Sequence, residues 1–234
     1  MKSFRRIAVA VGLIAAVTAG TLLATSATSS AATPFANGKD PIIFVHGILS
    51  TSSIWDTMEA SLKQNDGYTD SQLYAIDYTW QQSNVTTAQF IAQTVDQVLA
   101  KTGASQVDIV SHSMGSISSR YCIKFSGCAG KVNHWISLDG VNNGTSMWSA
   151  CSWIVACQEM APNSSVLTKL NTAPQLPTGV KWSTFWSANN FPVVPATSTE
   201  LPGATNTETA GNVSHISIPS DSAVISGVAQ TLGS

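Results

Sequence analysis

Residues 107–116, VDIVSHSMGS, run from an apolar stretch into small residues, and a helical pattern follows over residues 114–125. This order predicts a buried strand, a sharp turn and a helix, with Ser113 at the tip of the turn. The stretch matches the nucleophile-elbow pattern G-x-S-x-G, except that Ser111 replaces the first glycine. Small residues at such a turn let the strand and the helix approach closely, which pushes the central hydroxyl out above the sheet. Ser113 is therefore the candidate nucleophile, although residues 111–115 could also form an ordinary turn.

Apolar and β-branched runs alternate with helical patterns along the rest of the chain. Strands are predicted at residues 42–45, 73–78, 107–110, 132–138, 180–185 and 207–213. Between them, Ile54, Met58 and Leu62 recur at helical spacing, and another apolar face runs from Phe90 to Leu99. This alternation favours an α/β domain whose mostly parallel sheet, of about six strands, is flanked by helices.

The first 32 residues have the pattern of a secretory signal peptide. A basic start precedes an apolar run over residues 7–24, and small residues end the segment at Ala32. An uncleaved membrane anchor is the alternative, but the run is rich in Ala, Gly and Thr and a cleavage site follows it directly. We therefore predict cleavage after Ala32, one secreted domain over residues 33–234, and no stable membrane anchor.

The composition also limits the classes of partner. The chain of 234 residues is 44% hydrophobic and 10% charged, with eleven Lys and Arg against thirteen Asp and Glu. The hydrophobic fraction suffices for one sizeable core. Because no basic excess is available to hold a phosphate backbone, nucleic acid is not an expected partner. We expect a monomeric domain.

Export gives the four cysteines, Cys122, Cys128, Cys151 and Cys157, an oxidising compartment in which an even set can pair. Three pairings are formally possible, and the local bridges Cys122–Cys128 and Cys151–Cys157 are the expected ones. The sequence has no Cys-x-x-Cys spacing of the kind that holds zinc.

A second apolar run, PIIFVHGIL at residues 41–49, ends in a glycine that permits a tight turn. In elbow folds, the loop after such a strand donates one backbone N–H to the oxyanion, and the residue after the nucleophile donates the other. Ile48 and Met114 are therefore the candidate oxyanion-hole residues.

The candidate general base is His215, in the late stretch GNVSHISI at residues 211–218. His46 belongs to the oxyanion turn, His112 adjoins the nucleophile on the wrong side of the elbow, and His134 lies inside a strand. The position of His215 suits the chain order nucleophile, acid, histidine, although a surface-loop histidine is the alternative.

The stretches PIIFVHGI, VDIVSHSMG and GNVSHISI resemble the class 2 lipase family of small secreted bacterial enzymes, particularly those of actinomycetes. The cysteine-containing segment at residues 149–171 is also similar to actinomycete members, so the resemblance spans most of the mature chain. It implies a compact α/β-hydrolase fold, little or no lid, and hydrolysis of carboxylic esters. It also implies that Ser113, His215, Ile48 and Met114 act in the roles given above.

The chain departs from that family at the acid of the triad, because Asn190 stands where an aspartate is expected. An asparagine can orient an imidazole but cannot stabilise its cation by charge. Asp139 is the leading replacement, since it follows the strand at residues 132–138 at the same edge of the sheet. Asp139 could instead serve only to turn the chain before Gly140. Weaker candidates for the acid are Glu200, Glu208 and Asp221.

The expected function is a lipase or esterase that acts on acylglycerols through a serine acyl-enzyme and needs no cofactor or metal. Its partner is then a lipid or ester substrate. The alternatives are a depolymerase of aliphatic polyester and a non-catalytic, hydrolase-like binding protein with a decayed triad. Apolar residues either line the mouth of the site or pack in the core: Met147, Trp148, Trp153, Ile154, Val155, Trp182 and Trp186.

Overall fold

The computed structural model describes residues 35–234, so the predicted signal peptide at residues 1–32 lies outside the described residues. Within this range, six parallel strands form one sheet in the order β2-β1-β3-β4-β5-β6. The strands are β1 (Ile42–Val45), β2 (Leu73–Ile76), β3 (Val107–His112), β4 (Val132–Leu138), β5 (Lys181–Trp186) and β6 (Thr205–Glu208). The predicted α/β class and parallel sheet are confirmed.

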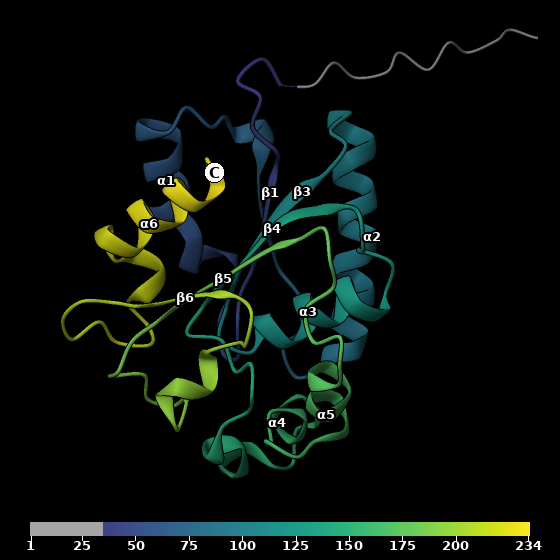
Figure 1. Cartoon of the computed structure of the whole chain (residues 1–234), viewed down its shortest axis with the longest axis vertical. Helices are drawn as coiled ribbons and strands as arrows, with labels where there is room; N and C mark the ends of the chain where they lie inside the picture. Colours follow the sequence, from purple (N-terminus) through teal and green to yellow (C-terminus); the bar gives the residue numbers. More distant parts are fainter. Residues whose placement is uncertain (1–34) are drawn as a thin grey trace, which may run out of the picture. The chain divides into compact units, whose positions relative to one another are not determined.

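Helices cover both faces of this sheet (Figure 1). One face carries α1 (Asp56–Asn65) and α6 (Ser222–Leu232), and the other carries α2 (Asn84–Thr102) and α3 (Gly115–Phe125). Two short helices, α4 (Val155–Glu159) and α5 (Ser165–Asn171), lie beyond the carboxyl ends of the strands. Short 3-10 helices span Ser52–Trp55, Asp70–Gln72, Ser146–Cys151, Ala196–Thr199 and Ile218–Ser220. None of the helices between residues 35 and 234 is both long and apolar enough to cross a membrane.

The last strand differs most from the prediction, because β6 begins at Thr205 and ends at Glu208 rather than covering residues 207–213. Its sequence is TNTE, and all four residues are exposed. A strand at the edge of a sheet needs no apolar face when nothing packs on it, so hydrophobicity gives no signal for its bounds.

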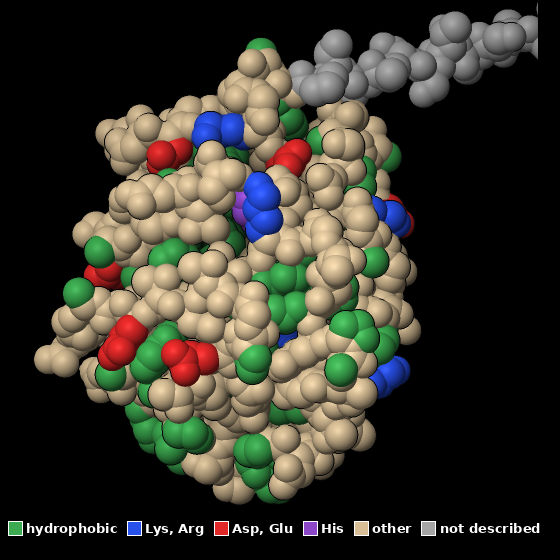
Figure 2. All heavy atoms as spheres, viewed as in Figure 1, with side chains coloured by type: hydrophobic (Ala, Val, Ile, Leu, Met, Phe, Trp, Pro, Cys, Tyr) green, Lys and Arg blue, Asp and Glu red, His purple; other side chains and the backbone are tan. Residues whose placement is uncertain are grey.

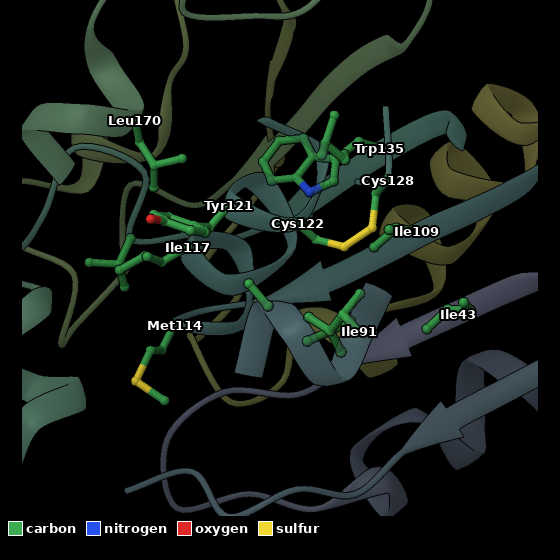
Figure 3. Packing of buried hydrophobic residues seen from close by; sticks show 14 of the residues in the cluster. Ile43, Ile91, Ile109, Met114, Ile117, Tyr121, Cys122, Cys128, Trp135 and Leu170 are labelled. Atoms are coloured by element: carbon green, nitrogen blue, oxygen red, sulfur yellow. A yellow bond between two sulfur atoms is a disulfide. The ribbon is translucent and has the colours of Figure 1, made fainter. Parts of the chain in front are cut away.

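The core between the sheet and α2 and α3 is built from buried aliphatic and aromatic side chains (Figure 3). Trp135 is fully buried, and its Nε1–H donates to Ser119 Oγ of α3 at 2.8 Å. The centre of its ring lies 5.1 Å from that of Trp182, a pairing that adds about 0.5–1.5 kcal/mol to the gain from area burial. Trp182 and Trp186 were expected either at the mouth of the site or in the core. Both are buried in the core.

Both predicted disulfides are present. Cys122–Cys128 joins α3 to the loop before β4, and Cys151–Cys157 joins a 3-10 helix to α4. The first bridge lies within the buried core (Figure 3). Of the three pairings that the sequence allows, the structure therefore has the local one.

Parallel strands bring their carboxyl ends to one edge of the sheet, where ligands and catalytic groups of open α/β folds gather. The turn after β1 contains Ile48, the turn after β3 contains Ser113, and Asp139 follows β4 directly. Asn190 lies in the loop that follows β5. Topology thus places all four residues at the same edge.

Candidate active site

Ser113 occupies a strained turn between β3 and α3. Its φ of +55° is in the left-handed region that residues with a Cβ rarely adopt. The turn is packed so tightly that a Cβ on Gly115 would clash with the carbonyl oxygen of His46. A Cβ on Gly47 would lie 2.7 Å from the Cβ of Ser113. Glycine is therefore required at both positions, and the geometry is that of the predicted elbow.

Ser111 replaces the first glycine of the elbow pattern, and its hydroxyl points toward other buried polar groups. Ser111 Oγ donates to the carbonyl oxygen of Ile136 at 3.2 Å and lies 3.1 Å from Ser116 Oγ. Ser116 Oγ in turn lies 2.9 Å from Ser137 Oγ of β4. The extra side chain is thus accommodated because its hydroxyl finds partners, which a buried polar group requires.

His215 lies beside the serine, as predicted. Its Nε2 is 2.9 Å from Ser113 Oγ, and its Nδ1 is 2.7 Å from Asn190 Oδ1. An amide oxygen can only accept, so Nδ1 carries the proton and Nε2 accepts the serine hydroxyl. In this tautomer His215 is ready to take the proton of Ser113.

Asn190 is held in the orientation that presents its oxygen to the imidazole. Its Nδ2 donates to Thr199 Oγ1 at 3.3 Å, which fixes the amide nitrogen on the far side. Sequence reasoning gave Asp139 precedence over Asn190, yet the direct hydrogen bond to His215 comes from Asn190.

Asp139 faces the same imidazole from slightly farther away. Its Oδ2 is 3.6 Å from Nδ1 of His215, and its side chain is fully buried. Oδ1 accepts the backbone N–H of Ser187 at 2.9 Å, whereas Oδ2 has no hydrogen-bond partner among the described residues. The φ of Asp139 is +46°, and a Cβ on Gly140 would clash with Ser137 Oγ. The tight turn expected at Asp139 is thus present, and it aims the carboxylate at the histidine.

The three weaker acid candidates do not reach the imidazole. Asp221 caps α6, because its Oδ1 accepts the backbone N–H groups of Ala223 and Val224 at 3.0 Å each. Within residues 35–234, neither Glu200 nor Glu208 forms a hydrogen bond or an ion pair with His215.

The predicted oxyanion-hole residues border Ser113. Among the described residues, no hydrogen-bond acceptor is found for the backbone N–H of Ile48 or of Met114. The turn that carries Ile48 is braced by Tyr78, whose hydroxyl donates to the carbonyl oxygen of His46. The rings of Tyr78 and His46 stack with their centres 4.2 Å apart. Both backbone N–H groups are thus free to donate to a substrate oxygen, which is what the predicted role in an oxyanion hole needs.

His112 contacts His215, the candidate base. Its Nε2–H donates to the backbone carbonyl oxygen of His215 at 2.8 Å, and the centres of the two rings lie 4.6 Å apart. Burial lowers the pKa of His112 to about 3, because the imidazolium cannot be hydrated there. His112 therefore remains neutral at ordinary pH and serves as a donor. Sequence reasoning excluded it as the base and found no other role for it.

A cavity of about 460 Å³ opens onto Ser113. Apolar side chains provide most of its lining: Ile48, Leu49, Trp80, Val141, Met147, Ala150, Trp153, Ile154, Met160, Phe191, Pro192 and Val193. Of the residues expected at the mouth, Met147, Trp153 and Ile154 line this cavity. Trp148 instead packs against the core, and Val155 is exposed outside the cavity.

Three apolar side chains at this cavity face solvent. The exposed fractions are 79% for Leu49, 78% for Trp153 and 67% for Phe191. Figure 2 also shows hydrophobic side chains gathered toward the bottom of the view, where Figure 1 places the loops beyond the carboxyl ends of the strands. Exposed apolar groups around a pocket mark a binding surface.

No group of three or more His, Cys, Asp or Glu side chains in the described part of the chain could hold a metal ion.

A family model and a curated relative both match this chain. The model of the class 2 lipases, described as Lipase (class 2), matches residues 39–216. A triacylglycerol lipase of Burkholderia plantarii is 32% identical over 113 residues, which are 44% of this chain and 30% of that protein. The chain thus spans about a third of the length of this curated relative.

Solved structures show the same fold. Lipase B of Aspergillus fumigatus superposes with a TM-score of 0.71 at 18% identity, over 85% of this chain and 54% of that chain. The mature form of Bacillus licheniformis lipase BlEst2 superposes with a TM-score of 0.70 at 20% identity, over 86% of this chain and 94% of that chain. At these identities the likeness establishes the fold, which is that of α/β-hydrolase lipases and esterases.

Proposed function

The chain belongs to the class 2 lipase family, and from this premise we propose that it is a secreted serine carboxylic ester hydrolase that cleaves acylglycerols. Membership of the family supports a lipolytic ester hydrolase. The observation that carries the finer proposal is the 2.9 Å contact between His215 Nε2 and the Oγ of Ser113, a residue that lines an apolar cavity.

In the proposed reaction, Ser113 Oγ attacks the ester carbonyl carbon while His215 Nε2 takes the hydroxyl proton. The backbone N–H groups of Ile48 and Met114 stabilise the oxyanion, and each such donor is worth about 3 kcal/mol in the transition state. His215 then protonates the leaving alcohol, and the acyl group stays on Ser113. Water, deprotonated by His215, releases the acid. Asp139 supplies the negative charge that stabilises the imidazolium at each proton transfer.

The cavity supports an uncharged substrate with an apolar acyl chain. Its lining is almost entirely hydrophobic, and no Lys or Arg of the described residues contributes to it. Burying an acyl chain against such a surface is favourable by about 0.8 kcal/mol per CH₂ group. Esters of long-chain acids should therefore be better substrates than acetate esters.

A depolymerase of aliphatic polyester is the second candidate, favoured by the exposed Trp153 and Phe191 at the cavity. A polymer chain needs an open apolar surface rather than a closed tunnel, and the same serine chemistry would cleave it. Release of soluble acids from a polyester film, compared with release from a triacylglycerol emulsion, distinguishes the two substrates.

Secretion is supported by the two disulfides, because such bridges persist in oxidising compartments. The predicted signal peptide would deliver the chain there. Expression of the full sequence, followed by mass measurement of the protein in the culture medium, tests this: the mass should correspond to a chain that begins at Thr33.

Turnover of p-nitrophenyl esters tests the catalytic proposal. The wild-type protein should hydrolyse them, and Ser113→Ala should abolish turnover while the thermal melting temperature stays close to that of the wild type. A wild-type protein without turnover would support the binding-protein alternative that Asn190 suggests.

A further inference from the structure

One nitrogen of the candidate base faces two different side chains. Nδ1 of His215 lies 2.7 Å from Asn190 Oδ1 and 3.6 Å from Asp139 Oδ2. In a standard serine triad a single carboxylate accepts this proton, fixes the tautomer and stabilises the imidazolium. Here the closer group is neutral and the charged group is the more distant one.

Asn190 has the geometry for orientation but not for charge. Its amide oxygen accepts the Nδ1–H, and Thr199 Oγ1 holds the amide nitrogen away from the ring. This contact selects the tautomer in which Nε2 can accept from Ser113. A neutral amide cannot, however, offset the positive charge that forms when His215 takes the serine proton.

Asp139 has the charge but does not make the direct hydrogen bond. Its Oδ2 is fully buried and has no hydrogen-bond partner in the described part of the chain. A buried carboxylate oxygen without a partner is unfavourable unless a cation forms next to it. The nearest group that can become a cation is the imidazole of His215, since the pKa of the adjacent His112 is lowered to about 3.

We propose that the work of the triad acid is divided between two residues: Asn190 orients the imidazole of His215, and Asp139 stabilises its cation. Both are positioning residues that act through His215. This inference rests on the proposed serine hydrolase function. It assigns Asn190 a role in the reaction instead of treating it as a lost acid.

Exchange of the two side chains provides the test, because each has an isosteric counterpart. Asp139→Asn should lower kcat by at least about 100-fold, since loss of the triad carboxylate can cost about 10⁴. Adding Asn190→Asp to that variant returns a carboxylate to the imidazole, at the nearer position, and should recover at least about tenfold. The amide oxygen introduced by Asp139→Asn can still accept the N–H of Ser187, so the turn keeps its hydrogen bond.

The single variants at Asn190 separate orientation from charge. Asn190→Ala should lower kcat. It should not shift the acidic limb of the pH profile of kcat, because the charge near His215 is unchanged. Asn190→Asp adds a second carboxylate and should move that limb to higher pH. The groups that face the imidazole, Asp139 and the neutral His112, are the same in both variants.

Two results would overturn the division. A double variant no more active than Asp139→Asn would make Asp139 a structural support of its turn. Wild-type kcat in Asn190→Ala would remove the orienting role. Failure of the underlying function looks different, because the wild-type protein itself would then hydrolyse no ester. Melting temperatures of all variants show whether each has folded.

Discussion

The ring of His112 donates a hydrogen bond from Nε2 to the backbone carbonyl oxygen of His215, at 2.8 Å. The two residues are 103 positions apart, so this contact fastens the loop that carries the base to the strand that carries the nucleophile. Proton transfer depends on sub-ångström placement of that base, so the contact should affect catalysis. It should also affect stability, because a buried carbonyl oxygen without a donor is unfavourable.

We expect His112→Phe to lower kcat by about tenfold or more, because a 1 Å misplacement of a catalytic group can cost about 10². Loss of the donor should also lower the free energy of unfolding by about 1–3 kcal/mol. Ester hydrolysis and denaturant unfolding measure the two effects. His112→Gln, which retains a donor, is the matched control and should lose less. Equal kcat values for wild type and His112→Phe would show that the contact does not position His215.

The same histidine predicts a pH dependence of stability. The pKa of His112 is lowered by burial from its usual 6.5 to about 3, so below pH 6.5 the unfolded chain binds a proton that the native protein does not. The stability that the neutral ring contributes is therefore present above pH 6.5 and is lost as the pH falls toward 3. His112→Phe should show a shallower loss of unfolding free energy over this range. Parallel curves for both proteins would contradict the assignment.

Gly47 should tolerate no side chain. A Cβ there would lie 2.7 Å from the Cβ of Ser113 and 3.1 Å from the carbonyl oxygen of His112. We expect Gly47→Ala to displace the nucleophile or the oxyanion loop and to lower kcat by about 10² or more. Gly233→Ala is the control, because its Cβ would find ordinary contacts at 3.6 Å. Wild-type kcat in Gly47→Ala would mean that the turn is looser than the structure has it.

The exposed aromatic side chain at the cavity should affect substrate preference more than chemistry. Trp153→Ala removes an indole that is 78% exposed and borders the cavity, so KM for long-chain p-nitrophenyl esters should rise. The kcat for the acetate ester should stay within about twofold, because the reacting atoms are untouched. Phe90→Ala is the control, since Phe90 is also exposed but lies on α2, outside this cavity. An unchanged KM for every chain length would remove Trp153 from the binding surface.

Much of the site could be predicted from sequence because its signals are local. The elbow at Ser113 is a run of small residues between a strand and a helix, and His215 is the histidine that remains after the others are placed. The α/β fold follows from the alternation of strands and helices. The bounds of β6 could not be predicted, because an exposed polar edge strand carries no apolar pattern.

The family resemblance placed Asn190 at the acid position of the triad, but the distance of Asp139 from the same imidazole could not be predicted, because it depends on backbone geometry that no motif records. Asp139 and Asn190 end up 3.6 Å and 2.7 Å from the same nitrogen. Asp139 lies in a left-handed turn, and Asn190 is held by a hydrogen bond to Thr199. The contact between His112 and His215 also could not be predicted from the sequence, since it joins residues that are distant in the chain.

Every proposed step depends on Ser113 being a nucleophile that His215 activates. Mass spectrometry of the protein after treatment with a serine-directed phosphonate ester tests it most directly. We expect one covalent adduct, located on the peptide that contains Ser113, with labelling lost in Ser113→Ala and strongly slowed in His215→Ala. An unlabelled wild-type protein, or an adduct on another residue that persists in Ser113→Ala, would contradict it.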